Sequence, residues 1–299
     1  MTVLCISGSR ADYGYILPIA KALGEEVYDL APLTVGRDTP DSISLRLGTI
    51  ATCVAHRIAK EKPRLALVVG DRWEISAACH ACVLSGVPIA HYGAGDVTTG
   101  SYDDLFRHSI SALAALRFGL TEKGSTACNA VWAGCTSVQP PDEIPTGDGT
   151  AILALYPETA GDDLRNAQAA ICEVLAAHGL TPLVIGSNPD VGASGYPGAS
   201  LPLAEFHKRL AAASVIIGNS SAGIIEAPIL GTPTVNIGAR QHGRPQAPSV
   251  FQADTGAYSL SAAIGAALAY GKRRTASPYY RPDAVGIVVR AIRSHLRKP

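Results

Sequence analysis

Short apolar runs, each of strand length, alternate with longer amphipathic stretches along nearly the whole chain of 299 residues. The strands of a parallel sheet read as continuous apolar runs, because helices cover both of its faces. The alternation therefore predicts doubly wound parallel sheets of the α/β class. The expected strands are TVLCISGS, LAPLTVG, RLALVVGD, PIAHYGA, RFGLTE, AILALYP, PLVIGS, SVIIGNS and PTVNIG. The expected helices lie over 16–24, 43–60, 74–86, 103–116, 162–178, 201–213 and 259–270.

A segment rich in proline, glycine and acidic residues, QPPDEIPTGDGT at 139–150, interrupts this alternation after the fifth expected strand. We interpret it as a linker between two Rossmann-like domains, at 1–140 and 150–275, with a C-terminal helix at 282–299 joining the first domain. Ligands of open parallel sheets bind beyond the carboxyl ends of the strands. Two such domains facing each other are therefore expected to define a cleft.

The composition excludes several classes of partner. Lysine plus arginine and aspartate plus glutamate both number 25, so no positive surplus is available for a nucleic-acid backbone. No apolar run approaches the ~20 residues that cross a membrane, and no signal-peptide pattern opens the chain, so a cytoplasmic protein is expected. The apolar composition is compatible with a homodimer.

The seven cysteines lie mostly in apolar segments and are expected to be small buried side chains without disulfides. Cys79 and Cys82 have the Cys-x-x-Cys spacing, but they fall inside an expected helix and no second pair exists. This context favours burial over a metal or redox centre, and no metal site is predicted.

Polar turns follow the expected strands of the first half, where this architecture places its chemistry. SGSRADYG at 7–14 combines small residues with Arg10, which suits either an anion site or an ordinary turn. Asp71 follows a run of apolar residues. It is either a partly desolvated carboxylate suited to proton transfer or a cap for the next helix.

The stretch HYGAGDVTTGSYDDLFRHS is the densest in polar side chains, with His91, Asp96, Asp103, Asp104, Arg107 and His108. Residues four apart share a helix face, which groups Asp103 with Arg107 and Asp104 with His108. These groups are either surface ion pairs behind a helix cap or carboxylates that converge on one site for acid–base chemistry and anion recognition.

In the second half, the turn after SVIIG carries three hydrogen-bond donors at an expected helix start: Asn219, Ser220 and Ser221. The positive end of the helix dipole there suits a diphosphate. Glu226 lies about one and a half turns later among apolar residues, where ribose hydroxyls would satisfy its carboxylate; the alternative is a glutamate in solvent. Arg240 and Arg244, in the loop after PTVNIG, would complete an anion clamp.

The order of these motifs resembles that of the bacterial UDP-N-acetylglucosamine 2-epimerase family, particularly the hydrolysing members of sialic-acid-type pathways. The matching stretches are SGSRADYG, VVGDRWE, AHYGAGDVTTGSYDDLFRHSI, YPET, GNSSAGIIEAP and PTVNIGARQHGR. The resemblance implies the two-domain GT-B architecture, a UDP-sugar ligand whose nucleotide is held mainly by the C-terminal domain, and no required cofactor.

In that family, a base removes the proton on sugar carbon 2 while UDP leaves carbon 1, and water then adds to the glycal to release N-acetylmannosamine. The resemblance assigns acid–base roles to Asp71, Asp96, Asp103 and Asp104. It assigns substrate and UDP binding to Arg10, Arg107, His108, Asn219, Ser220, Ser221, Gly223, Glu226, Arg240 and Arg244.

Some positions depart from the family's pattern. Asp96 stands where relatives commonly have glutamate, and Tyr156 and Arg37 stand where they usually have histidine. A shift of about 1 Å in a catalytic group can cost on the order of a hundredfold in rate. Two other functions therefore stay open on this fold: a nucleotide-sugar hydrolase or glycosyltransferase, and a nucleotide-sugar binding protein without catalysis.

Overall fold

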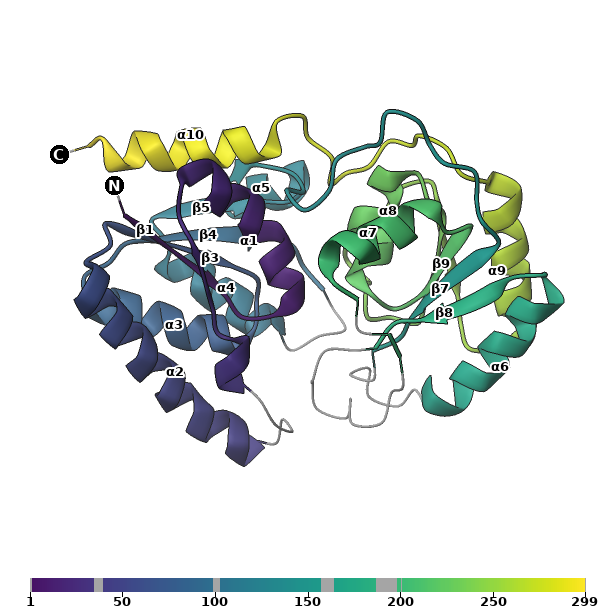
Figure 1. Cartoon of the computed structure of the whole chain (residues 1–299), viewed down its shortest axis with the longest axis horizontal. Coiled ribbons are helices and arrows are strands. Elements are labelled where there is room, and N and C mark those ends of the chain that lie inside the picture. The colour runs from purple at the N-terminus through teal and green to yellow at the C-terminus, as the bar shows by residue number, and fades with distance from the viewer. Residues whose placement is uncertain are drawn as a thin grey trace. The chain divides into compact units, whose positions relative to one another are not determined.

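The computed structural model describes residues 2–34, 40–98, 103–156, 164–186, 198–199 and 201–298, without the side chains of 10, 11, 34, 40 and 164–166. The chain forms two compact units, each built on one parallel sheet (Figure 1). The first unit comprises Met1–Val97, Tyr102–Ser137 and Tyr280–Pro299, and the second consists largely of Val138–Tyr279. Sheets of six and five strands, doubly wound by helices, confirm the predicted α/β fold class.

The sheet of the first unit has the strand order β2-β1-β3-β4-β5-β6. Its strands are β1 (Val3–Ser7), β2 (Val27–Asp29), β3 (Leu65–Val69), β4 (Ile89–Ala94), β5 (Leu116–Gly119) and β6 (Val131–Trp132). Its helices are α1 (Arg10–Leu23), α2 (Pro40–Glu61), α3 (Trp73–Leu84), α4 (Asp103–Leu113), α5 (Glu122–Ala127) and α10 (Ala284–Leu296). Every residue of β1 and β3 is buried, because α1 and α10 cover one face of the sheet and α2, α3 and α4 cover the other (Figure 1).

The sheet of the second unit has the strand order β11-β10-β9-β7-β8. Its strands are β7 (Thr150–Ala154), β8 (Thr181–Val184), β9 (Val215–Gly218), β10 (Thr234–Ile237) and β11 (Val250–Ala253). Its helices are α6 (Leu164–Ala177), α7 (Leu203–Ala212), α8 (Ser221–Leu230) and α9 (Ala257–Tyr270). Helices α6 and α9 lie on one face of the sheet and α7 and α8 on the other (Figure 1).

One predicted strand, LAPLTVG at 30–36, is wrong. The strand β2 comes earlier and pairs with β1, and Ala31–Thr34 forms a 3₁₀ helix. Pro32 cannot donate a ladder hydrogen bond. The Asp29 carboxylate also accepts a hydrogen bond from the Ala31 backbone nitrogen at 3.1 Å, which turns the chain out of the sheet. Residues 35–39, and with them Arg37, lie outside the described part. The short elements α5, β6 and β11 were not predicted.

The segment predicted as a linker contains no helix or strand before Thr150, which begins β7. The C-terminal segment is tied to the first unit by Arg281, which donates to the Trp132 carbonyl, and by Arg293, which donates to the Ala22 carbonyl at 3.0 Å. No helix among the described residues is long and apolar enough to cross a membrane.

The cysteines of the Cys-x-x-Cys pair are free and buried in α3, as predicted. Burial raises the pKa of the Cys82 thiol to about 12, so this thiol is protonated and inert at neutral pH.

Candidate functional site

The strand order reverses at one place in each sheet. In the first unit the chain runs outward from β1 to β2 and then the other way from β3 to β6, so the reversal lies between β1 and β3. In the second unit it lies between β7 and β9. Ligands of open parallel sheets bind beyond the carboxyl ends of the strands at such a reversal. The turns after these four strands are therefore the expected ligand-binding turns.

The turn after β1 enters α1 through Ser9 and Asp12. The Ser9 Oγ accepts a hydrogen bond from the Asp12 backbone nitrogen at 3.2 Å and donates to Asp12 Oδ2 at 2.8 Å. Burial, followed by the negative charge of Asp71, raises the pKa of Asp12 to about 8, so Asp12 is mostly a neutral acid at pH 7. Asp12 was not predicted as a site residue, although the Ser-x-x-Asp spacing signals a helix start.

The turn after β3 is held by buried groups. Gly70 has a φ of +91°, and a Cβ there would lie 2.5 Å from Asp12 Oδ1, so only glycine fits. His91 of β4 donates from Nε2 to the Gly70 carbonyl at 2.9 Å and accepts at Nδ1 from Ser111 Oγ at 2.9 Å; a carbonyl can only accept, which sets this tautomer. Burial lowers the pKa of His91 to about 4, so the ring is neutral. Asp71, the next residue, is thereby fixed in position.

Arg107 of α4 is the centre of a polar cluster in the first unit. Its side chain is 2% exposed, pairs with the carboxylates of Asp71 and Asp104, and donates to the Asp96 carbonyl at 2.9 Å. Burial alone would lower the pKa of Arg107, but the charges of Asp71 and Asp104 outweigh it and raise that pKa. The residue at the N-cap position of α3 is Arg72, whose side chain makes no cap hydrogen bond.

The other predicted residues of this unit lie around the cluster or outside it. Asp103 is partly buried in the first turn of α4, and His108 is exposed. The side chain of Arg10 lies outside the described part of the chain. Glu74, which sequence reasoning missed, is 2% exposed and pairs with Arg72 at 3.0 Å.

In the second unit, the turns after β7 and β9 are joined to each other. Asn219 Oδ1 accepts from the Tyr156 backbone nitrogen at 2.6 Å, and Asn219 Nδ2 donates to the Tyr156 carbonyl at 2.8 Å. Gly218 permits the close approach: its φ is +136°, and a Cβ would lie 2.0 Å from the Ala154 carbonyl oxygen. The Asn219 amide thus holds the two turns together.

The two predicted clamp arginines lie beside this bridge. Arg240 and Gln241 both donate to the Asn219 carbonyl, at 3.0 Å and 2.8 Å, and Arg244 donates to Gln241 Oε1. The Arg240 guanidinium also lies 4.9 Å from the centre of the Tyr156 ring, within the range of a cation–π interaction. The linking roles of Gln241 and Tyr156 were not predicted.

Helix α8 begins at the turn that was predicted from the sequence to bind a diphosphate. Ser220 is the N-cap residue, whose side chain accepts from the Ala222 backbone nitrogen at 3.3 Å, and Ser221 is the first helical residue. Gly223 faces β10, where a Cβ would lie 2.7 Å from Thr234 Cγ2. The glycine thereby lets the helix pack closely on the sheet.

Glu226 lies in the apolar middle of α8 and is 7% exposed. The alternative in which this carboxylate lies in solvent is therefore wrong. His207 of α7 donates from Nε2 to Glu226 Oε1 at 3.1 Å. His207 was not predicted, because the sequence of an amphipathic helix does not show which residue of a later helix a given side chain contacts.

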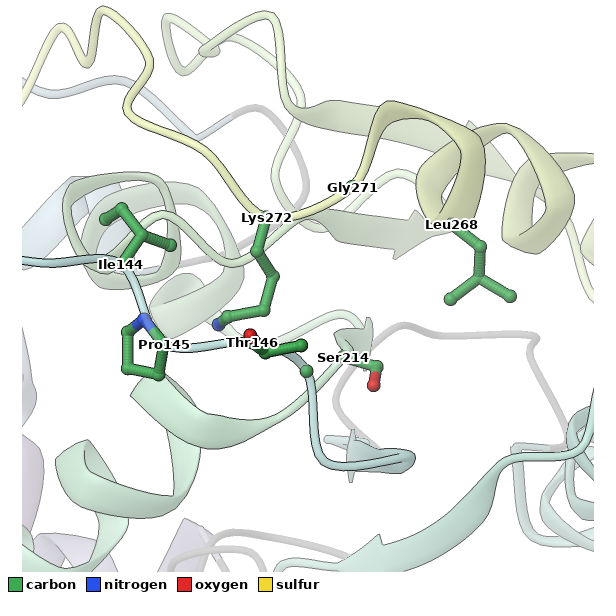
Figure 2. A pocket seen from close by; sticks show the side chains of 8 residues that line it. Ile144, Pro145, Thr146, Ser214, Leu268, Gly271 and Lys272 are labelled. Carbon is green, nitrogen blue, oxygen red and sulfur yellow. The ribbon is translucent and has the colours of Figure 1, made fainter.

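A cavity of about 380 Å³ lies elsewhere in the second unit, lined by Ile144, Pro145, Thr146, Gly147, Ser214, Leu268, Gly271 and Lys272 (Figure 2). Ser214 directly precedes β9, so the cavity is at the amino edge of the sheet, away from the turns described above. Lys272 donates to the carbonyls of Ala211 and Ala213 and to Thr232 Oγ1, and so holds the end of α7. No cluster of potential metal ligands occurs in the described segments.

Residues 2–128 and 198–293, more than half of the chain, match the family model described as UDP-N-acetylglucosamine 2-epimerase. The chain belongs to the UDP-N-acetylglucosamine 2-epimerase family. The matched ranges include the Arg107 cluster, the start of α8 and Glu226. This membership confirms the resemblance seen in the motifs.

Similar proteins support the same conclusion. The UDP-N-acetylglucosamine 2-epimerase of Neisseria meningitidis is 24% identical over 90% of this chain and 88% of that protein. A Legionella pneumophila protein named UDP-N,N′-diacetylbacillosamine 2-epimerase (hydrolyzing) is 24% identical over 84% of this chain and 77% of that protein. These names include both hydrolysing 2-epimerases and 2-epimerases without that qualifier.

Solved structures show the GT-B fold. UDP-GlcNAc 2-epimerase of Methanocaldococcus jannaschii, solved with UDP-GlcNAc and UDP, matches with a TM-score of 0.79 at 16% identity. The match covers 98% of this chain and 100% of the Methanocaldococcus jannaschii chain. The Neisseria meningitidis UDP-GlcNAc 2-epimerase bound to UDP-GlcNAc has a TM-score of 0.78 at 16% identity, with the same coverage. Membership in the 2-epimerase family supports the prediction that this protein is an enzyme.

Proposed function

We propose that this chain is a hydrolysing UDP-N-acetylglucosamine 2-epimerase, which converts a UDP-acetamido sugar into UDP and N-acetylmannosamine or a related sugar. The observation that carries the proposal is the cluster around Arg107, which gathers Asp71, Asp96 and Asp104 at buried or partly buried positions. Those are residues to which the family's motifs assign acid–base work. The hydrolysing name of the Legionella pneumophila relative supports the choice of type.

The reaction balances without an oxidant or a reductant. A carboxylate takes the proton from sugar carbon 2, and the electron pair of that C–H bond forms a double bond between carbons 1 and 2. The bond from carbon 1 to oxygen breaks, and its electron pair leaves with UDP. Water then adds: hydroxide bonds to carbon 1, and a proton returns to carbon 2 on the opposite face. The carbon-2 proton is weakly acidic, so stabilisation of the leaving diphosphate must lower the barrier.

In the first unit, Asp71, Asp96, Asp103 and Asp104 are the candidates for proton transfer. Arg107 is a positioning residue, since its guanidinium pairs with two of these carboxylates and fixes their orientation. A rigid, buried partner of this kind supplies the preorganised geometry that proton transfer requires.

In the second unit, the diphosphate is assigned to the start of α8, where Ser220 and Ser221 lie at the positive end of the helix dipole. Arg240 and Arg244 add positive charge beside that helix start. Glu226 is assigned to the ribose hydroxyls. Stacking on Tyr156 keeps Arg240 in place, which supports nucleotide binding even though relatives usually carry histidine at that position.

The test is to incubate the purified protein with UDP-N-acetylglucosamine and UDP-N,N′-diacetylbacillosamine in D₂O. Free UDP is measured, and the released sugar is analysed by NMR. We expect UDP and a 2-epimerised sugar that carries deuterium at carbon 2. Asp71→Asn should abolish turnover and retain UDP binding, whereas Asp41→Asn, at an exposed position of α2, should change neither.

Other results would favour the rival functions. A released sugar with the original configuration and no deuterium indicates a simple hydrolase, and release only with an added acceptor indicates a glycosyltransferase. UDP binding by calorimetry without turnover or solvent exchange indicates a binding protein. Release of no UDP from any UDP-acetamido sugar would contradict the epimerase assignment.

A further inference from the structure

Glu226 is a carboxylate in an apolar setting. Every residue of α8 from Ala222 to Leu230 is buried, and the helix packs on α7 (Figure 1). A carboxylate at such a place is costly unless hydrogen bonds satisfy its oxygens. The imidazole of His207 supplies one of these bonds, from Nε2 to Glu226 Oε1 at 3.1 Å.

The helix that carries His207 is itself anchored. Thr232 Oγ1 donates to the Leu210 carbonyl at 2.7 Å, and Lys272 donates to the carbonyls of Ala211 and Ala213 at the end of α7. The His207 side chain is 15% exposed, so its ring has little freedom to turn away. The imidazole therefore holds Glu226 Oε1 in a direction set by two packed helices.

A carboxylate can accept about four hydrogen bonds. The bond from His207 occupies one of these positions and restrains the rotation of the carboxylate. A carboxylate of fixed orientation binds two neighbouring hydroxyls better than a rotating one, because less side-chain entropy is lost on binding.

We propose that His207 is a positioning residue that orients Glu226 toward the two hydroxyls of a ribose, and that it thereby sets the preference for ribonucleotides over 2′-deoxyribonucleotides. The proposal rests on the assignment of Glu226 to the ribose in the proposed function. A binding site whose charged acceptor takes a hydrogen bond from a ligand hydroxyl discriminates strongly against a ligand that lacks this hydroxyl, because the acceptor is then left without that partner.

The experiment measures the dissociation constants of UDP and 2′-deoxy-UDP by calorimetry in the wild type, His207→Leu and His207→Gln. Leucine removes the donor, whereas glutamine retains an N–H that can reach the carboxylate. His178→Leu is the matched control: it removes a partly buried histidine of the same unit that bonds to Ser261 Oγ at 2.9 Å.

We expect His207→Leu to weaken UDP binding roughly tenfold, the loss expected for a hydrogen bond to a charged group. Binding of 2′-deoxy-UDP, which keeps only one of the two hydroxyls, should weaken by less than that of UDP, so the preference for the ribonucleotide falls. His207→Gln should keep most of the preference, and His178→Leu should keep all of it. In a Glu226→Gln background, His207→Leu should have little further effect, because the two residues act through one carboxylate.

Equal weakening of both nucleotides by His207→Leu would show a merely structural role and would overturn the inference. The inference would also be overturned if the wild type clearly favours UDP over 2′-deoxy-UDP and His207→Leu shows the same preference. In that case the proposed function stands. A wild type that binds no UDP would overturn both. If His207→Leu does not fold, as judged by circular dichroism, His207→Phe removes the same donor with an aromatic ring of similar shape, and the same comparison applies.

Discussion

Replacing Asp12 by asparagine is expected to stabilise the protein at neutral pH by an amount that grows as the pH rises. The buried carboxyl group has a pKa of about 8 in the folded state against 3.8 as the ordinary value. Because the folded pKa is raised, the contribution of Asp12 to stability is full below about pH 4 and is lost as the pH rises toward 8. Asparagine does not titrate, so the variant does not suffer this loss.

The magnitude follows from the size of the shift. One unit of pKa difference corresponds to about 1.4 kcal/mol. The stability of the variant relative to the wild type should therefore rise by about 1.4 kcal/mol per pH unit between about pH 5 and pH 7, or roughly 3 kcal/mol over that interval. The asparagine side-chain oxygen can still accept the bond that Ser9 Oγ donates. Any packing cost of the amide nitrogen is independent of pH and does not enter the slope.

The assay is urea unfolding followed by tryptophan fluorescence at pH 5, 6 and 7. Both tryptophans, Trp73 and Trp132, belong to the first unit, so the signal reports the unit that contains Asp12. Glu26→Gln, which removes an exposed carboxyl group just after α1, is the control for the loss of a carboxyl group. A difference for Asp12→Asn that stays constant from pH 5 to pH 7 would refute the reasoning, since it would mean that Asp12 ionises in the folded protein as it does in the unfolded chain.

Three further outcomes are expected. Burial lowers the pKa of His91 to about 4 from 6.5, so its contribution to the free energy of unfolding is present above pH 6.5 and is lost as the pH falls toward 4. His91→Gln should remove this pH dependence, which urea unfolding measures. Gly70→Ala should destabilise the first unit by about 1–3 kcal/mol more than Gly86→Ala. Both glycines have positive φ, but only a Cβ at Gly70 meets another atom, so equal losses would contradict the contact. Tyr156→Leu should weaken UDP binding severalfold in calorimetry and Tyr156→Phe should not, because phenylalanine keeps a ring under Arg240.

The sequence by itself determined the parallel α/β class and most of the element order. Apolar runs of strand length followed by amphipathic stretches are local patterns, and they reflect burial on both faces wherever the strand lies in the sheet. The start of α8 was predictable for the same reason, since Ser220 and Ser221 act within their own helix turn. The family's motifs are equally local and pointed to the correct family.

Only the tertiary structure decided which side chains meet. Arg107 pairs with Asp71 across 36 positions of sequence, and His207 reaches Glu226 from another helix. The false strand at 30–36 has a different, local cause, because the Ala31 backbone nitrogen donates to the Asp29 carboxylate where an apolar pattern predicted a strand. Contacts such as those of Arg107 and His207 depend instead on the order of strands in a sheet and on the packing of helices over it. Asp12 became a neutral acid for that reason: β1 and β3 are neighbours, which places its carboxyl group against Gly70 and near the charge of Asp71.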